Sequence, residues 1–329
     1  WALRFPSAVF GVLGVGFAWV VARRLFRPLH IGRVAAAAAA LLMAVSPLHV
    51  YYSQEARMYT LLVALALLAG YTLMGLSRSW RRWSAFVLAG TALLYTHYFG
   101  AFLLLALALC WLVATVTTKD RVRSDAATTA EHPERRPARR SLAGRSRRGG
   151  WTRHILRLRP PQPSLAWPAA SAQDALVPGL LAFAAIALLY LPWLPAMLDR
   201  YQQDRSYWQG ALKLGEALRH VALSFTTGAP ETMLEPDGLR LLPWFGLAAL
   251  IAVAALLRQE WTARRAGQRG PSSVLTLLVV LLLPVVAVLL LASRSPKFNP
   301  RYLMLVSPAY LLLLAGGIAA LIRAPFAST

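Results

Sequence analysis

The chain has 329 residues, of which 57% are hydrophobic and 15% are charged. A soluble domain carries about 25% charged residues, so this chain has too little polar surface to solvate a globule of its size. Its net charge of +22 would suggest a nucleic-acid partner in a soluble protein, but the basic residues stand between apolar blocks, and we expect no nucleic acid. The single cysteine, Cys110, excludes an internal disulfide and a cysteine-rich metal site.

Apolar residues fall in nine blocks, each close to the roughly 20 residues that a helix needs to cross about 30 Å of hydrocarbon. The blocks occupy 7–22, 34–50, 58–76, 84–99, 100–116, 175–194, 239–257, 273–292 and 302–322. A membrane barrel would show shorter segments of alternating polarity, which the sequence lacks. The sequence therefore predicts an all-α, polytopic integral membrane bundle with about nine transmembrane helices.

Basic residues predict the orientation of these helices. Three short turns between blocks each contain an arginine pair: Arg23-Arg24, Arg81-Arg82 and Arg264-Arg265. Because short cytoplasmic turns are enriched in Lys and Arg, we place these turns inside and the alternate turns outside.

We divide the chain into three parts. Residues 1–116 form a first helical group, and 175–329 form a second group with a long outer loop at 195–238. Between them, 117–174 is rich in Arg and Pro and cannot bury enough apolar surface to order itself. We expect a disordered cytoplasmic linker there, with binding to anionic lipid as the alternative. Within the outer loop, 211–223 has the mixed pattern of an amphipathic helix on a membrane surface.

The most informative outer segment follows the second block. It reads Ser-Pro-Leu-His-Val-Tyr-Tyr-Ser-Gln-Glu-Ala-Arg-Met-Tyr over 46–59, and its proline is placed to loosen the helix end. If the segment is helical, Tyr52, Glu55 and Tyr59 share one face, and Arg57 points about 200° away from Glu55. Ionisable groups at this depth are costly and usually functional. The alternative is a loop anchored by tyrosines with a Glu–Arg surface pair.

Two further outer segments carry cations beside aromatic residues. Tyr-Thr-His-Tyr-Phe-Gly at 95–100 joins the fourth and fifth blocks in a very tight turn, and it offers His97 as a donor to phosphate or a metal ligand. Ser-Pro-Lys-Phe-Asn-Pro-Arg-Tyr at 295–302 opens the last block, where Arg301 stands at a helix start that also favours an anion. The alternatives are a structural histidine and an arginine that reaches lipid headgroups.

Together the three segments place four cations on one face: Arg57, His97, Lys297 and Arg301. Cations between tyrosines at the membrane edge suggest a pocket for an anionic, membrane-borne ligand, such as a lipid phosphate or diphosphate. No cluster of metal ligands is evident in the sequence, so we assign no cofactor and leave the participation of a divalent metal open.

At these residues the chain resembles a known family. The runs Tyr-Tyr-Ser-Gln-Glu-Ala-Arg-Met-Tyr (51–59), Tyr-Thr-His-Tyr-Phe-Gly (95–100) and Pro-Arg-Tyr (300–302) resemble the bacterial branch of the GT-C membrane glycosyltransferases. These enzymes are of the family 39 type, similar to protein O-mannosyltransferases and the lipid A aminoarabinose transferase. The opening run from Leu3 to Gly11 also resembles the family's early helix.

The resemblance implies an inverting transfer of a sugar from a polyprenyl-phosphate donor to a lipid, glycan or protein acceptor, with membrane lipids as further partners. It places the protein in the bacterial inner membrane with the active site facing outward. It makes Arg57, His97 and Arg301 candidates for binding the donor phosphate, with Lys297 beside them. Four tyrosines would line the pocket: Tyr52, Tyr59, Tyr98 and Tyr302.

One feature of the family has no counterpart here. Its principal acidic motif lies in the first outer loop, before the helix that opens this chain. We therefore expect an N-terminal helix and that outer loop, with the main acidic residue, to precede Trp1. Glu55 is the only acid in the matched segments, and we assign it a supporting catalytic role, in orienting substrate or contacting a metal.

Other functions stay open at this point. A transporter or flippase for an anionic polyprenyl-linked lipid would also need such a site, although the charges lie at helix ends and no repeat is visible. A non-catalytic fragment of the transferase family is a further possibility, as is a polysaccharide polymerase or ligase that uses the same kind of donor.

Overall fold

The structure is a computed structural model that describes residues 2–74, 80–131, 172–203, 213–228, 235–268, 270–294 and 298–323. Within these ranges the chain is helical and contains no strand, which confirms the predicted fold class. The elements are α1 (Phe5–Leu25), α2 (Gly32–Val45), α3 (Pro47–Ser53), α4 (Tyr59–Leu73), α5 (Trp80–Thr96), α6 (Gly100–Glu131), α7 (Ala172–Tyr190), η2 (Leu191–Trp193), α8 (Leu194–Gln203), α9 (Leu214–Thr226), α10 (Glu235–Arg265), α11 (Ser273–Arg294), η3 (Pro300–Val306) and α12 (Ser307–Arg323).

Membrane-spanning capacity differs among these helices. In the described part of the chain, six helical stretches are long and apolar enough to cross a membrane, or seven if the bent pair α2–α3 counts as one span. The helices α4 and α5 each cover a predicted block, but they have only 15 and 17 residues. The polytopic bundle is thus confirmed, whereas the predicted number of nine spans includes two helices shorter than the usual crossing length.

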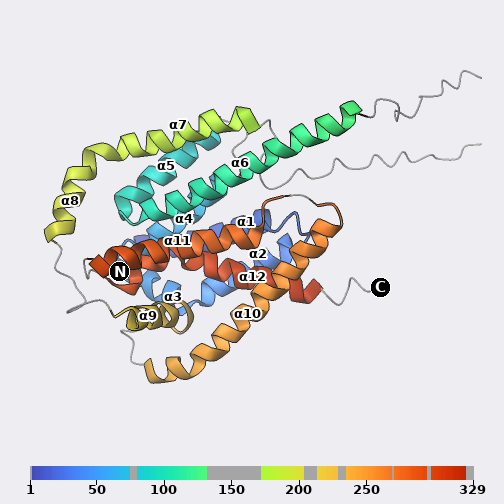
Figure 1. The fold of residues 1–329 in the computed structure, drawn as a ribbon. Coiled ribbons are helices and arrows are strands. Elements are labelled where there is room, and N and C mark those ends of the chain that lie inside the picture. The colour runs from blue at the N-terminus through green and yellow to red at the C-terminus, as the bar shows by residue number, and fades with distance from the viewer. Residues whose placement is uncertain are drawn as a thin grey trace, which may run out of the picture.

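The last helix forms the centre of the bundle. Of the apolar stretch that runs through η3 and α12, 72% is buried inside the protein, against 11% in α10. The helix α12 packs on α2 and α10, and the packing continues from α2 through α1, α4 and α5 to α7 at the rim (Figure 1). A Cβ on Gly317 would collide with the backbone of Ala252 in α10, so this glycine permits the close approach that membrane helices achieve through small residues.

A helix break positions the first polar segment. The residue before the proline, Ser46, is extended with φ −61° and ψ 118°, as expected from the clash of a proline ring with a preceding helical residue. The helix α3 consequently leaves α2 at 59° and packs against α1. There the Nε2 of His49 donates to the Gly11 carbonyl at 3.0 Å, and a side chain at Gly11 would collide with Ser53.

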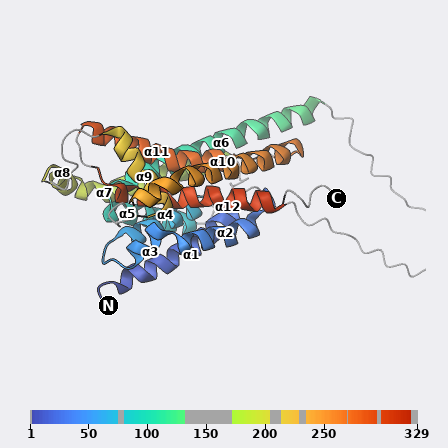
Figure 2. The ribbon, with the colours of Figure 1, turned by 90° about the horizontal axis from the view of Figure 1, so that it is seen from below.

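The two ends of the bundle carry different polar groups. The N-terminus lies at the same end as α3, α8 and α9, and α12 ends at the other (Figures 1 and 2). We call the first the motif end, because 46–59 lies there, and the second the arginine end. The helix α1 connects them: the Ser7 hydroxyl donates to the Arg57 carbonyl at 3.1 Å, and Arg24 donates to the Met74 carbonyl at 3.1 Å. At 1.5 Å per residue, these contacts lie about 25 Å apart.

The connections agree in part with expectation. The tight turn after the fourth block is confirmed, because α5 ends at Thr96 and α6 begins at Gly100. The expected linker at 117–174 lies largely outside the described residues: α6 runs to Glu131, α7 begins at Ala172, and the disorder predicted between them stays a prediction.

The expected outer loop at 195–238 contains two helices, α8 and α9. The predicted amphipathic helix corresponds to α9, which begins and ends three residues later than expected. Its buried face includes Ala217 and Val221 and packs against α3, η3 and α10. Protein contacts therefore cover part of the apolar face, whereas Leu214 and Leu218 are 56% and 47% exposed, and the predicted place on the membrane surface stays a prediction.

A buried carboxylate fixes the start of α11 at the arginine end. Glu260, near the end of α10, accepts hydrogen bonds from the Ser272 hydroxyl at 2.5 Å and from the backbone N–H groups of Ser273 and Val274 at 2.5 and 3.0 Å. These amides belong to the first turn of a helix, where N–H groups have no partner within the helix and the dipole favours a negative charge. Glu260 thus joins α10 to α11.

Replacing Glu260 by alanine should lower stability, because each buried amide left without an acceptor costs about 1–3 kcal/mol. We expect the melting temperature of the purified protein to fall by about 5 °C or more, as measured by thermal denaturation in detergent. The matched control is Glu216→Ala, because Glu216 forms only an exposed pair with Lys213 at 4.0 Å. Equal losses in the two variants would contradict this role for Glu260.

Candidate functional site

A cavity of about 830 Å³ lies at the motif end. Its walls come from the α3–α4 connection, the turn between α5 and α6, the start of η3, and the α7–α8 segment. Six of the residues singled out in the sequence line it: Arg57, Tyr59, His97, Tyr98, Arg301 and Tyr302. The fold thus brings the three polar segments, which lie far apart in the sequence, to one space.

His97 is the point at which the three segments meet. Its ring centroid lies 6.5 Å from that of Tyr59, 4.9 Å from that of Tyr98 and 5.4 Å from that of Tyr302. Phe99 packs against both His97 and Tyr302, with centroid separations of 5.1 and 5.4 Å. Aromatic pairs at such distances stabilise one another beyond the area that they bury, so the cluster holds the imidazole in a fixed position.

The environment of His97 determines its protonation. The side chain is 7% exposed and stands in the turn between α5 and α6, outside the membrane-spanning segments. Burial, and secondly the charge of Arg301, lowers the pKa of His97 from 6.5 to about 4. Its Nδ1 accepts from the Phe99 N–H at 3.3 Å, which places the proton of the neutral ring on Nε2. Near neutral pH, His97 is therefore an uncharged hydrogen-bond donor.

Glu55 and Arg57 form an ion pair, with 3.1 Å between Arg57 Nε and Glu55 Oε2. The helical arrangement considered for 46–59 would have separated them, and it is wrong because α3 ends at Ser53 and α4 begins only at Tyr59. The two side chains are 47% and 29% exposed. A pair so open to solvent contributes at most about 1 kcal/mol, so a phosphate could readily compete for Arg57.

Arg301 also lines the cavity. It follows Pro300 at the start of η3, and its guanidinium carbon lies 5.9 Å from the centre of the Tyr302 ring. The helix start that we expected to attract an anion is a 3₁₀ turn, and the Arg301 N–H already donates to the Asn299 side chain at 3.1 Å. The guanidinium, rather than this backbone amide, is the group of Arg301 that can bind an anion.

Two predicted site residues differ in placement from the others. Tyr52 is buried behind Tyr59, with the ring centroids 4.7 Å apart, and it is absent from the cavity wall. It therefore supports Tyr59 rather than lining the pocket. Lys297 lies outside the described residues, and its assignment stays a prediction.

The α7–α8 segment supplies part of the wall that sequence reasoning missed. Tyr190, Trp193, Arg200 and Gln203 line the cavity from this side. Tyr95 links it to α5: its hydroxyl donates to the Leu189 carbonyl at 3.0 Å, and its ring packs on Tyr190 and Trp193. The sequence does contain a signal, namely an arginine near tryptophan and tyrosine just after the sixth block. The same pattern is typical of an aromatic belt at the membrane interface, so it does not by itself indicate a site. Arg200 adds a third guanidinium to the site.

The described residues do not form a metal site. Among them, no three His, Cys, Asp or Glu side chains lie close enough together to hold a metal ion. Two acidic residues stand close to lining residues in the sequence: Asp199 directly precedes Arg200, and Glu55 is paired with Arg57. The described lining of the cavity supplies cations, a neutral imidazole and aromatic rings.

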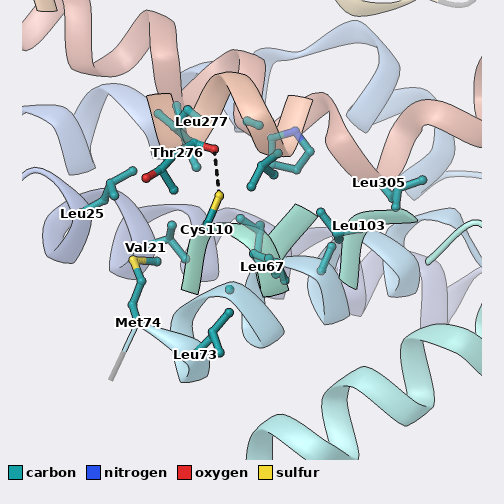
Figure 3. A pocket seen from close by; sticks show the side chains of 17 residues that line it. Val21, Leu25, Leu67, Leu73, Met74, Leu103, Cys110, Thr276, Leu277 and Leu305 are labelled. Carbon is teal, nitrogen blue, oxygen red and sulfur yellow. Dashed lines mark hydrogen bonds between the residues drawn. The ribbon is translucent and has the colours of Figure 1, made fainter. Parts of the chain in front are cut away.

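A second cavity, of about 70 Å³, lies within the bundle and is almost wholly apolar (Figure 3). Leu67, Leu103 and Leu277 are among its lining residues, and the Cys110 thiol donates to the Thr276 carbonyl at 3.8 Å. This geometry agrees with Cys110 as a small hydrophobic residue. The cavity offers no ionisable cluster, so it is not a second candidate site.

Comparison with known proteins adds one family. Residues 1–130 match the family model described as dolichyl-phosphate-mannose-protein mannosyltransferase. The match supports a membrane glycosyltransferase of the GT-C type. It includes the segments 46–59 and 95–100, whereas Arg301 and the α7–α8 wall of the cavity lie beyond it. No curated protein and no solved structure matches the chain.

The lowered pKa of His97 predicts a pH-dependent stability. Between pH 6.5 and 4 the unfolded chain binds a proton at His97 that the folded chain does not. The contribution of the neutral His97 to the free energy of unfolding is therefore complete above pH 6.5 and is lost as the pH falls toward 4. From pH 7 to 5 the loss should be about 2 kcal/mol. The stability gap between wild type and His97→Gln should therefore narrow by that amount, as measured by thermal denaturation at both pH values.

The control for this titration is Tyr95→Phe, which removes the hydrogen bond to Leu189 without changing any group that titrates in this range. Its stability gap from wild type should be the same at both pH values. If the stability difference between wild type and His97→Gln were also the same at pH 7 and pH 5, the pKa of His97 would not be lowered as its burial predicts.

Proposed function

We propose that this protein is a membrane glycosyltransferase that moves a sugar from a polyprenyl-phosphate donor to a hydroxyl group of a lipid, glycan or protein acceptor. The reaction takes place on the extracytoplasmic side of the bacterial inner membrane. The observation that carries the proposal is the convergence of Arg57, His97 and Arg301, from three separate segments, on one aromatic-lined cavity at the end of the membrane spans.

The cations of the cavity suit a membrane-borne phosphate. Guanidinium groups bind phosphate through two parallel hydrogen bonds, and the cavity offers them on Arg57, Arg200 and Arg301. The neutral His97 can add one further hydrogen bond from Nε2 without taking a proton from the site. A phosphate bound here would sit at the level where its polyprenyl chain can stay in the bilayer.

The bound phosphate is the leaving group in this scheme. The acceptor oxygen attacks the anomeric carbon, the bond from that carbon to the phosphate oxygen breaks, and polyprenyl phosphate leaves with the electron pair. The acceptor hydroxyl loses its proton to a base, and attack opposite the leaving group inverts the anomeric carbon. Fixed cations that stabilise the charge developing on the phosphate are worth about 10²–10³ in rate for each important contact.

The aromatic residues are placed to hold the sugar. Tyr59, Tyr98 and Tyr302 surround His97, and Trp193 faces the same cavity from the α7–α8 segment. Tyrosine and tryptophan offer an apolar ring surface together with a polar group, which fits the mixed surface of a hexose. These rings would orient the anomeric carbon between the phosphate and the acceptor.

Glu55 acts in this proposal as a positioning residue. Its carboxylate lies 3.1 Å from Arg57 Nε, so it orients the guanidinium toward the cavity and leaves the terminal nitrogens for the phosphate. The Ser7 hydroxyl donates to the Arg57 carbonyl and holds the same loop from α1. Both contacts reduce the cost of ordering Arg57 when the donor binds.

The proposed function predicts that Arg301→Ala lowers the rate of donor turnover by about 100-fold or more. Release of polyprenyl phosphate from a panel of polyprenyl-phosphate sugars would be followed in membrane vesicles that contain the protein. Arg301→Lys should keep part of the activity, because it retains the charge without the bidentate geometry. Arg258→Ala, on the exposed part of α10 toward the arginine end, is the matched control and should be fully active.

A different result would point to another activity. Donor that binds without releasing polyprenyl phosphate, and does so equally in wild type and Arg301→Ala, would contradict the transferase. It would support a carrier for the polyprenyl-linked lipid instead.

Glu55→Gln separates positioning from proton transfer. Since the amide can still accept a hydrogen bond from Arg57, we expect the KM for the donor to rise about three- to tenfold while kcat changes less than twofold. Steady-state kinetics over a range of donor concentrations would measure both. A fall of kcat by about 100-fold, with loss of the basic limb of the pH–rate profile, would instead make Glu55 the general base.

A further inference from the structure

A third cavity, of about 960 Å³, lies at the arginine end. Seven basic side chains line it, and they come from α1, the α1–α2 connection, α2, α5 and α12: Arg23, Arg24, Arg27, His30, Arg33, Arg82 and Arg323. The polar segments of the candidate active site do not reach it, because α1 separates the two ends by about 25 Å. Nothing in the proposed transfer reaction uses this cavity.

Contacts between the elements hold the rim of this cavity together. Arg24 donates to the Met74 carbonyl at 3.1 Å, and its guanidinium carbon lies 5.5 Å from the centre of the Tyr71 ring. At the end of α12, Arg323 donates to the carbonyl of His30, whose φ of 58° turns the chain between α1 and α2. The C-terminal end of α12 is thereby attached to the same wall as the end of α1.

The charge inside the cavity is not balanced by the residues that line it. Six guanidinium groups keep their positive charge at any physiological pH, and no acidic side chain lines the cavity in the part of the chain that the structure describes. Glu260 lies toward this end, but its carboxylate already serves Ser272, Ser273 and Val274. Like charges gathered in one cavity repel one another, and a bound anion would remove that repulsion.

The cluster goes beyond the general enrichment of basic residues on one side of a membrane. That enrichment predicts arginines near the ends of spans. It does not predict that arginines from several helices line one cavity. Arg258, Arg264 and Arg265 on α10 satisfy it without lining the cavity. The Gln259 side chain donates to the Leu29 carbonyl at 3.2 Å, which shows that this part of α10 lies at the same end.

We propose that this cavity binds the phosphate-bearing headgroup of an anionic phospholipid from the leaflet at the arginine end. The cavity lies where the spans of α1 and α12 end, so its cations stand at headgroup level. Val20, Val34 and Tyr71 supply apolar surface beside the arginines, where acyl chains would continue from the headgroup. Basic pockets between membrane helices recognise anionic lipids through this combination of surfaces.

The test compares bound lipid in variants with equal total charge. The full chain, purified in detergent, would be mixed with dioleoyl phosphatidylglycerol or with dioleoyl phosphatidylcholine, and bound lipid counted by native mass spectrometry. The cavity variant is Arg33→Ala with Arg82→Ala, and the control is Arg258→Ala with Arg264→Ala. All four arginines are exposed, and each variant of the pair loses two charges.

We expect wild type and control to retain phosphatidylglycerol alike and to prefer it over phosphatidylcholine. The cavity variant should bind it about tenfold or more weakly, since each arginine near an anionic headgroup adds roughly fivefold to affinity. The charge-conserving variant Arg33→Lys with Arg82→Lys should keep most of the binding, which separates loss of charge from loss of fold.

Three results would overturn the proposal. Equal losses in the cavity and control variants would mean that surface charge alone attracts the lipid. Equal retention of phosphatidylcholine, which also carries a phosphate but has no net charge, would show that the cavity does not select an anionic headgroup. Displacement of the lipid by inorganic phosphate or glycerol phosphate at millimolar concentration would assign the cavity to a soluble anion.

Discussion

The whole arrangement depends on one constraint: inside hydrocarbon, every backbone N–H and C=O must find its partner within the protein. Long apolar helices meet this requirement residue by residue, so irregular polar chain is pushed to the two ends of the bundle. The break at Pro47, the turn at 97–99 and the approach to Arg301 all lie at one end as a result. The candidate site therefore lies where the helices end.

Much of the fold follows from this constraint and could be predicted from the sequence. Apolar blocks mark the helices, because a helix that crosses lipid needs apolar side chains. The fourth and fifth blocks adjoin with no residues left for a long loop, which predicts the tight turn before Gly100. The position of α9 was harder to predict than its helical character, because part of its apolar face packs on α3, η3 and α10. Sequence periodicity reveals such a face but not the partner that covers it.

The candidate site was predictable to the extent that its residues lie in short, dense motifs. His97 and the tyrosines near it attract notice because ionisable and aromatic groups are unusual between apolar blocks. The pairing of Arg57 with Glu55 could not be read from helical angles, since the backbone between Ser53 and Tyr59 is not helical. Arg200 was missed because its role depends on where α8 folds back, which is a property of the tertiary structure.

The two hydrogen bonds at the ends of α1 have a mechanical consequence. One joins Ser7 to the carbonyl just before α4, and the other joins Arg24 to the carbonyl just after it. Sliding α4 along α1 by a single helical turn, about 5.4 Å, would break both at once. The two helices consequently behave as one rod of fixed length, and that rod sets the distance between the Arg57 loop and the arginine end. Any movement of the Arg57 loop relative to the arginine end therefore requires α1 and α4 to move together.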